Sequence, residues 1–301
     1  MVSIQAVKPS NFYRMFMVPP GSQIKLSSHP SEINFENIDK HTAKKVLKQN
    51  KERIAELQHI LHAQGKQSLL VVLQGMDASG KDGAIKKVLS GSNSRGGVNP
   101  IGCQVTSFRA PSETDLKYDY LKRIHTHIPP KGSIGVFHRS HYEDVLSPRV
   151  KGLISPSIWK KRYDQINAFE RMLSENNVKI VKIFLHVSQE EQMERLKERI
   201  HNPRKHWKFS MADLRERKHW TRYIKAYEDA ISKTSTEWAP WFIVPADKKW
   251  LKNLIISQIL VDTMESMRLR LPENIIDMDQ IKKEKLLDGD LSTFTEPEEN
   301  V

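Results

Sequence analysis

A glycine-rich loop directly follows a short, continuously apolar segment, and this succession constrains the fold more than any other feature of the chain. Residues 68–74 read SLLVVLQ, the pattern of a strand buried on both faces of a parallel sheet. The next residues, GMDASGKDG from Gly75 to Gly83, have the Gly-x4-Gly-Lys spacing of a phosphate-binding loop. In such loops backbone N–H groups and the next helix N-terminus bind phosphate oxygens, while the lysine neutralises charge. The flanking strand and helix patterns favour this reading over a glycine-rich surface turn.

Four more apolar segments follow, at 103–108, 132–138, 179–187 and 241–245, with helical patterns between them. This alternation predicts right-handed crossovers and an α/β fold, with a five-stranded parallel sheet between layers of helices. A long amphipathic helix is predicted before the loop, ending at Gly65, and another after Lys248. Further helix starts are expected at Ser112, Ser155, Ser188 and Ser210.

The domain organisation predicted from the sequence is one domain with two appendages. Residues 1–38 lack a period and are expected to form an extension, residues 39–271 the domain, and residues 272–301 an acidic, mobile tail. No apolar run reaches the roughly 18–20 residues of a membrane helix. The single cysteine, Cys103, agrees with a reducing cytoplasm, which is the location we expect.

The charge of the chain is strongly uneven. The net charge is +12, but the stretch from Pro272 to Val301 has nine acidic residues and three lysines, which leaves +18 on the rest. A body this basic predicts a polyanionic partner: a nucleic acid, a phosphorylated polymer or an anionic membrane face. The densest basic stretch, 199–225, has nine Lys and Arg residues against two acidic ones. It favours a lid that closes over phosphates, with a solvated pair of charged helices as the alternative.

Carboxylates stand where phosphate would bind. Asp77 lies inside the loop, and Asp82 replaces the Ser or Thr that usually follows the lysine and binds Mg²⁺. A carboxylate facing phosphates is repelled unless a cation lies between them, so we predict that Asp77 is a magnesium ligand, direct or through water. Capping of the turn is the alternative role for Asp77. Asp82 could equally interact with the helix dipole.

The strand at 132–138 ends in His138, where a phosphate-loop enzyme is expected to hold a second acidic residue. Glu143 and Asp144 follow within two helical turns and could supply that carboxylate. Arg139 is placed to contact phosphate at the carboxyl edge of the sheet, where ligands collect in open α/β folds. A surface salt bridge is the alternative role for this arginine.

Four ordered segments resemble the polyphosphate kinase type 2 family. They read GMDASGKDG, RAPSETDLKYDYLKRIHTHIP, FHRSHYEDVL and RIHNPRKHWKFSMADL, and the resemblance covers about residues 40–270. It implies a P-loop kinase fold of the thymidylate-kinase type, with three α/β/α layers and a helical lid at about 199–225. It also implies Mg²⁺-dependent, reversible phosphoryl transfer between inorganic polyphosphate and a nucleotide, and a homo-oligomer, either dimer or tetramer.

Two departures from the family pattern affect the assignment of the site. His138 stands where many members have an aspartate, and Asn202 replaces an aspartate before the lid proline. The Tyr-Glu-Asp at 142–144 resembles instead the class III branch, whose members phosphorylate nucleoside mono- and diphosphates. We therefore assign the role of the second acidic residue, expected at position 138, to Glu143 and Asp144.

The expected site comprises four groups of residues. The catalytic group is Asp77, Lys81, Arg139, Glu143 and Asp144. The phosphate-binding group is Gly75, Ala78, Ser79, Gly80, Asp82, Gly83, Lys86, Arg199, Arg204, Lys205 and Lys208. The nucleotide-binding group is Phe108, Arg109, Ala110, Pro111, Asp119, Arg123 and Tyr142, and the ligands of Mg²⁺, or of Mn²⁺ as a substitute, are Asp77 and Asp144.

The predicted reaction converts AMP to ADP and ADP to ATP with polyphosphate as donor, and GMP and GDP are further candidate acceptors. An ATP-dependent nucleoside monophosphate kinase is one alternative, but it gives the +18 body and the basic lid no purpose. A nucleic-acid-binding protein is another, but it leaves a phosphate loop with an acidic residue idle. We therefore expect polyphosphate and AMP, ADP or ATP as partners, and neither nucleic acid nor a membrane.

Overall fold

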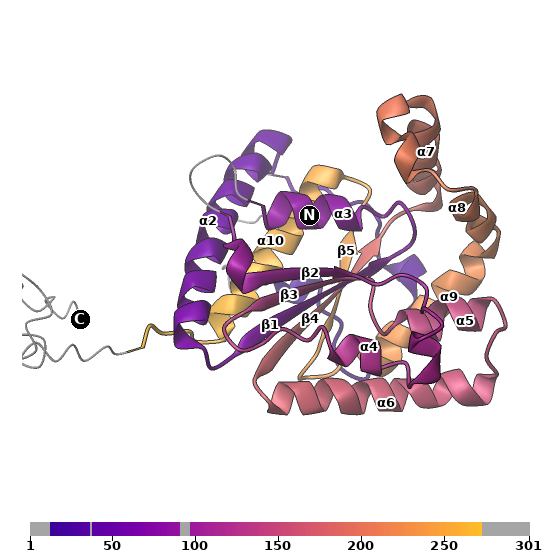
Figure 1. Ribbon diagram of the computed structural model, residues 1–301. Coiled ribbons are helices and arrows are strands. Elements are labelled where there is room, and N and C mark those ends of the chain that lie inside the picture. The colour runs from indigo at the N-terminus through magenta and orange to yellow at the C-terminus, as the bar shows by residue number, and fades with distance from the viewer. Residues whose placement is uncertain (1–12, 37, 91–96, 273–301) are drawn as a thin grey trace, which may run out of the picture. The chain divides into compact units, whose positions relative to one another are not determined.

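Five parallel strands form one sheet in the computed structural model, which describes residues 13–36, 38–90 and 97–272 (Figure 1). The strands are β1 (Ser68–Gly75), β2 (Cys103–Ser107), β3 (Ile134–His138), β4 (Val178–His186) and β5 (Trp241–Pro245). Their order is β2-β3-β1-β4-β5, so β1 lies at the centre between β3 and β4. The predicted five-stranded parallel sheet is confirmed.

Helices cover both faces of this sheet (Figure 1). One layer contains α2 (Lys40–Gln64), α3 (Lys81–Val88) and α10 (Lys249–Ser266), and the other contains α5 (Glu143–Val150), α6 (Pro156–Glu175) and α9 (Trp220–Thr234). The other helices include the short α4 (Lys122–His125) and a projecting group made of α7 (Gln189–His201), η6 (Pro203–Lys208), α8 (Met211–Glu216) and η7 (Arg217–His219). No helix within the described residues is both long and apolar enough to cross a membrane.

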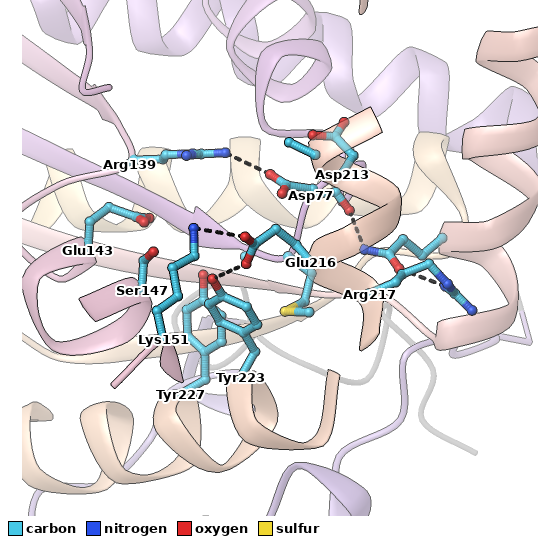
Figure 2. A pocket seen from close by; sticks show the side chains of 14 residues that line it. Asp77, Arg139, Glu143, Ser147, Lys151, Asp213, Glu216, Arg217, Tyr223 and Tyr227 are labelled. Atoms are coloured by element: carbon cyan, nitrogen blue, oxygen red, sulfur yellow. Dashed lines mark hydrogen bonds and ion pairs between the residues drawn. The ribbon is translucent and has the colours of Figure 1, made fainter. Parts of the chain in front are cut away.

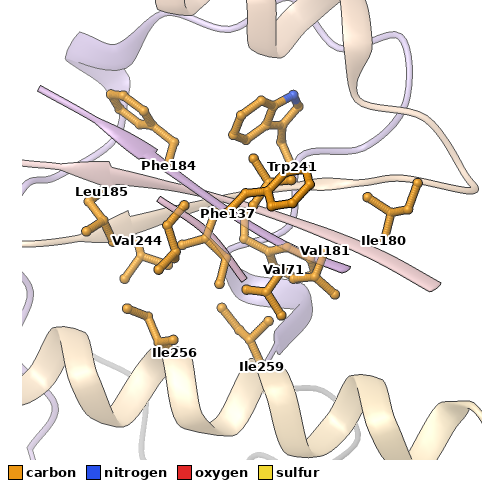
Figure 3. Close-up of a cluster of buried hydrophobic side chains, with 14 of the residues drawn as sticks. Val71, Phe137, Ile180, Val181, Phe184, Leu185, Trp241, Val244, Ile256 and Ile259 are labelled. Atoms are coloured by element: carbon orange, nitrogen blue, oxygen red, sulfur yellow. The ribbon is translucent and has the colours of Figure 1, made fainter. Parts of the chain in front are cut away.

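The core lies on both sides of the sheet because both faces are covered. All eight residues of β1 are buried, which explains why its sequence is continuously apolar instead of alternating. Figure 3 shows Ile256 and Ile259 of α10 directed at one face of the strands, while Phe184 and Trp241 lie on the opposite face. The central position of β1 means that the loop after it is surrounded by elements of both layers.

Some helices begin or end at the capping residues predicted from the sequence, and others do not. Gly65 ends α2 with a φ of 60°, in the left-handed region that glycine tolerates. Ser188 and Ser210 each accept a hydrogen bond from a backbone N–H in the first turn of the helix that follows. Ser155 begins α6 without a side-chain cap, and after Ser112 the chain forms only a three-residue 3₁₀ helix, η5 (Asp115–Lys117).

The segment before α2 packs along the outer edge of β5. The Val18 N–H donates to the carbonyl of Trp241 at 2.8 Å, and the Ile243 N–H donates to the carbonyl of Phe16 at 2.8 Å. These bonds use strand groups that an uncovered edge would expose to other chains. The rest of the predicted extension, residues 1–12, lies outside the described residues, as do residues 273–301 of the predicted acidic tail.

A buried ionic cluster ties the second helical layer to the sheet. The Lys182 ammonium on β4 donates to Glu170 Oε2 at 2.5 Å, to the Tyr142 hydroxyl at 2.9 Å and to the carbonyl of Thr234 at 2.6 Å. The other oxygen of Glu170 lies 3.1 Å from His141 Nε2 and accepts a bond from the Tyr142 hydroxyl at 2.8 Å. The cluster thereby fixes the residues that immediately precede α5.

We predict that Lys182→Met destabilises the protein by about 3–5 kcal/mol, because the fully buried Glu170 carboxylate would lose its cation. Urea unfolding measures this free energy. Lys179→Met, on the same strand but only partly buried, is the matched control and should change it by less than about 0.5 kcal/mol. Equal stabilities of the two variants would show that the cluster does not carry the expected energy.

Candidate active site

The glycine-rich loop turns directly from the end of β1 into α3. Gly75 has a φ of 148°, and a Cβ atom there would lie 2.8 Å from the carbonyl oxygen of Leu185 on the neighbouring strand. Ala78 and Gly80 also have positive φ angles, of 61° and 97°. Only glycine meets both the steric and the conformational demand at position 75. The loop therefore has a fixed, tightly wound backbone.

All six carbonyl oxygens of residues 75–80 accept hydrogen bonds from side chains. Lys81 Nζ donates to the first two at 2.7 and 3.2 Å, and Gln192 Nε2 donates to the third at 2.9 Å. Arg195 Nη1 donates to the fourth and fifth, each at 2.9 Å, and Lys252 Nζ to the sixth at 2.7 Å. Because the C=O and N–H of one peptide group point in opposite directions, N–H groups of the loop and of the first turn of α3 are left for an anion.

Two cavities meet at this loop. The larger, of about 720 Å³, lies over the loop, α3, α10 and the projecting helices, and we call it the P-loop cavity. The smaller, of about 220 Å³, lies between the loop, α5, α8 and α9, and we call it the lid cavity (Figure 2). Asp77, Arg139 and Asp213 line both cavities. The carboxylate of Asp77 and the guanidinium of Arg139 thus mark the junction.

The P-loop cavity is strongly cationic. Its lining has nine Lys and Arg residues against four acidic ones. Burial, followed by the positive charge of Arg139, lowers the pKa of Lys81 to about 8. An anion that enters this cavity would raise the pKa of Lys81 again, because it supplies a counter-charge to the buried ammonium.

Ion pairs and hydrogen bonds join charged side chains at the junction and in the P-loop cavity. Arg139 Nη2 lies 2.7 Å from Asp77 Oδ1, as Figure 2 shows. Asp82 Oδ1 lies 2.8 Å from His138 Nε2, and its other oxygen lies 3.5 Å from Lys208 Nζ. The hydrogen bond from His138 is the largest of the effects that lower the pKa of Asp82. The two departures from the usual phosphate-loop pattern, at positions 82 and 138, are therefore partners of each other.

Glu143 and Asp144 are neighbours in the chain but line different cavities. Glu143 lines the lid cavity together with Asp77. Asp144 lines a third cavity, of about 260 Å³, with its carboxylate 3.6 Å from Arg123 and 3.8 Å from Arg162; we call this the Asp144 cavity. Burial raises the pKa of Asp144 against the effect of the two arginines. The structure therefore does not bring the predicted metal pair, Asp77 and Asp144, into one cavity.

Of the seven predicted nucleotide-binding residues, three line the Asp144 cavity, two are exposed and two are buried. Pro111, Asp119 and Arg123 line the Asp144 cavity. Arg109 and Ala110 are exposed and line none of these three cavities.

Phe108 and Tyr142 correct the prediction, because both side chains lie in the core. Phe108 packs edge-on against Phe137 with 4.8 Å between ring centroids. Tyr142 is 1% exposed and bonded into the Lys182 cluster. Neither ring is free to stack on a base.

Most of the predicted phosphate-binding residues line the cavities at the loop. The P-loop cavity includes Ala78, Gly80, Lys81, Asp82, Gly83, Arg199, Lys205 and Lys208, and Gly75 lines the lid cavity. Lys86 and Arg204 line neither cavity, and Ser79 is fully buried. Lys86 is exposed on α3, and its neighbour Lys87 lines the P-loop cavity instead.

Sequence reasoning missed three of the residues that α7 and α10 contribute. Arg195, Lys249 and Lys252 all line the P-loop cavity. In the sequence, Arg195 follows Glu191 by four residues and is typical of an exposed helical ion pair. The one available signal was Lys252, a charged residue within the otherwise apolar run of α10.

The carboxylates in the lid cavity suit a magnesium ion. Asp77, Glu143 and Asp213 all offer hard oxygen ligands. Burial and the charge of Asp77 raise the pKa of Asp213, the effect of acidic groups gathered in one place. No group of three or more His, Cys, Asp or Glu side chains within the described ranges forms a complete metal site. In proteins Mg²⁺ usually binds through one or two carboxylates, substrate phosphates and water.

Comparisons with known proteins agree on one family. The family model described as polyphosphate kinase 2 matches residues 37–272. The chain is 45% identical to an AMP/ADP-polyphosphate phosphotransferase of Meiothermus ruber, over 86% of this chain and 96% of that protein. It is 42% identical to an ADP-polyphosphate phosphotransferase of Rhodopseudomonas palustris, over 86% of this chain and 92% of that protein.

A solved structure supports the same relationship. The crystal structure of polyphosphate kinase 2 from Arthrobacter aurescens superposes with a TM-score of 0.85 at 37% sequence identity. The superposition covers 93% of this chain and 97% of that one. The predicted fold type is thereby confirmed.

We predict that Arg195→Leu lowers the free energy of unfolding by about 3 kcal/mol, because buried carbonyl oxygens of the loop would lose their donor. Urea unfolding tests this value. Arg204→Leu removes an exposed arginine of the same region and should have an effect below about 0.5 kcal/mol. A variant at position 195 as stable as the one at position 204 would contradict the role of Arg195 in holding the loop.

Proposed function

The chain belongs to the polyphosphate kinase 2 family, and on that premise we propose that it transfers phosphoryl groups from inorganic polyphosphate to AMP and to ADP. The observation that carries the proposal is the junction of the two cavities. A cationic cavity suited to a phosphate polymer meets a carboxylate-lined cavity at Asp77 and Arg139, beside the phosphate loop.

The donor fits the P-loop cavity. Polyphosphate carries about one negative charge per phosphate, and the excess of Lys and Arg in the lining supplies the complementary field. Its terminal phosphate would lie at the loop, where N–H groups and Lys81 can bind it. Lys81 now donates to loop carbonyls, and a bound anion would draw its ammonium and raise its pKa.

The acceptor fits the opposite side of the junction. Two successive residues line the lid cavity and the Asp144 cavity, Glu143 the former and Asp144 the latter. Arg123 and Arg162, held by Asp144, place two guanidinium groups where an AMP or ADP could bind. We therefore place the nucleotide there, with its phosphate directed at Asp77 and Arg139.

Phosphoryl transfer needs in-line alignment and neutralisation of charge more than covalent chemistry. Lys81 from the P-loop cavity and Arg139 from the junction would stabilise the negative charge of the transferring group, and the lid would exclude water. Asp77 and Glu143 are the residues we propose as holders of Mg²⁺, which neutralises phosphate charge when bound. No side chain acts as a nucleophile in this scheme, so no phosphorylated enzyme is expected.

We predict that the purified protein makes ADP and then ATP from AMP when given Mg²⁺ and long-chain polyphosphate without ATP. Lys81→Ala should reduce this rate by about 10²–10³-fold, because the cation at the loop is lost. Lys86→Ala, on the same helix but outside both cavities, is the matched control and should retain the activity. Coupled nucleotide assays or chromatography measure the products. Formation of ADP from ATP plus AMP, with none from polyphosphate, would overturn the donor assignment.

A further prediction distinguishes the role of Glu143 from that of Asp144. Glu143→Gln should raise the Mg²⁺ concentration for half-maximal rate about tenfold, because a proposed metal ligand is lost. Asp144→Asn should leave that concentration unchanged and raise the KM for AMP about tenfold, because Arg123 and Arg162 would lose the carboxylate that positions them.

Asp164→Asn, at an exposed site on α6, serves as the control for both variants. Metal titrations and AMP saturation curves give the two constants. The reverse outcome, in which the Asp144 variant alone changes the metal requirement, would return the metal to Asp144.

A further inference from the structure

The side chain of Gln192 on α7 joins the phosphate loop to the short helix η7. It is 2% exposed, and its Nε2 atom donates to the carbonyl of Asp77 at 2.9 Å. Its Oε1 atom accepts a hydrogen bond from Arg217 Nη1 at 2.7 Å. Both bonds are drawn in Figure 2, between Asp77 and Arg217. Because a carbonyl only accepts and a guanidinium only donates, the two bonds are compatible with one orientation of the amide.

The bond to Asp77 determines the direction of one peptide group of the loop. A trans peptide is planar, so the N–H of Ala78 points away from the Asp77 carbonyl and thus from Gln192. Ala78 lines the P-loop cavity but not the lid cavity, whereas Gln192 lines the lid cavity but not the P-loop cavity. In the part of the chain that the structure describes, the Ala78 N–H forms no hydrogen bond. It is therefore left for an anion in the P-loop cavity.

This peptide group needs a partner that holds it in place. Ala78 has a φ of 61°, in the left-handed region that alanine rarely adopts. Rotation of the peptide between Asp77 and Ala78 changes this φ angle, so the rotation would relieve the strain and turn the N–H elsewhere. The hydrogen bond from Gln192 to the Asp77 carbonyl opposes that rotation.

Arg217 belongs to a segment that is anchored on two sides. Its Nη1 atom also donates to the carbonyl of Gln189 at 2.8 Å, at the start of α7. The preceding residue, Glu216, lies 2.8 Å from Lys151 Nζ and accepts a bond from the Tyr223 hydroxyl at 2.6 Å (Figure 2). Residues 216 and 217 thus connect α5 and α9 to α7, and they fix the guanidinium that orients the amide.

Gln192 and Arg217 do not lie on the donor side of the loop. Both line the lid cavity, and neither lines the P-loop cavity. An effect of either residue on the donor would therefore pass through the backbone of the loop. Direct contact of Arg217 with the acceptor is the alternative role, and it would change the binding of AMP instead.

We propose that Gln192 and Arg217 are positioning residues for the phosphate loop: Arg217 orients the Gln192 amide, and this amide holds the Asp77–Ala78 peptide with its N–H directed at the donor phosphate. The inference rests on the proposed polyphosphate-dependent activity and adds two residues that act on the donor through the loop. It also means that displacement of Arg217 from α7 weakens the binding of the donor.

Titration calorimetry with tripolyphosphate tests this role. Gln192→Leu should raise the Kd about tenfold and Arg217→Met at least about threefold, because a hydrogen bond from the loop to a charged group is lost. Lys218→Met is the matched control, because it removes the same charge from an exposed side chain that lines neither cavity. It should raise the Kd less than about twofold, since an exposed charge is screened by salt. Equal Kd values in Arg217→Met and Lys218→Met would overturn the proposal.

Two combined variants distinguish positioning of the peptide from a general loss of structure. In the Gln192→Leu background, Arg217→Met should change the Kd less than about twofold, because the amide through which it acts is gone. In the Ala78→Gly background, Gln192→Leu should raise the Kd only about two- to threefold, because glycine tolerates the left-handed region and gains nothing by leaving it. Full additivity of the effects in either background would overturn the proposal.

Steady-state kinetics separate the donor from the acceptor. In both single variants the KM for long-chain polyphosphate should rise, while the KM for AMP changes less than about twofold. A rise in the KM for AMP alone would assign Arg217 to the acceptor and overturn the proposal. Arg217→Met keeps the test falsifiable if Gln192→Leu does not fold, because Arg217 is only partly buried. Failure of the proposed function would instead show in the wild type, which would then make no ADP from polyphosphate.

Discussion

The hydrogen bonds that hold the carbonyl oxygens of residues 75–80 are the interaction on which the site depends. A loop wound this tightly has few internal bonds, so its shape has to be fixed from outside. The donors come from α3, α7 and α10, three helices that converge only because β1 lies at the centre of the sheet. The sheet order thus determines which side chains can reach the loop, and these determine where its N–H groups point.

Carboxylates of the chain itself pair with several cations of the P-loop cavity. Arg199 pairs with Asp213 at 2.9 Å, Lys208 with Asp82 at 3.5 Å, and Lys205 with Glu198. Partly exposed pairs of this kind contribute little to stability. A polyanion can therefore replace these carboxylates at low cost, and the lid residues that now hold one another become available to the polymer. Lys252 is the exception in this set, since it pairs with no carboxylate in the part of the chain that the structure describes.

Residues 142–144 explain why the sequence could predict a cluster but not its roles. Successive residues of a helix are rotated by about 100°, so three neighbours at a helix start face three directions. Tyr142 enters the core, Glu143 the lid cavity and Asp144 a cavity lined by arginines. The pattern identified a functional segment, but only the direction of α5 against the sheet decided which carboxylate lies near Asp77. The same argument separates Lys86 from Lys87 on α3.

By itself the sequence determined the strands, the parallel sheet, the glycine-rich loop and the basic stretch at 199–225, because each depends on local periodicity, on composition or on spacing within a few residues. It also indicated the family through four ordered motifs. The tertiary structure decided the pairing of Asp82 with His138, the division of the acidic residues between cavities, and the arrival of Arg195 and Lys252 at the loop. The contacts of Asp82, Arg195 and Lys252 join residues 56 to 172 positions apart. No local pattern records which distant side chains a crossover brings together.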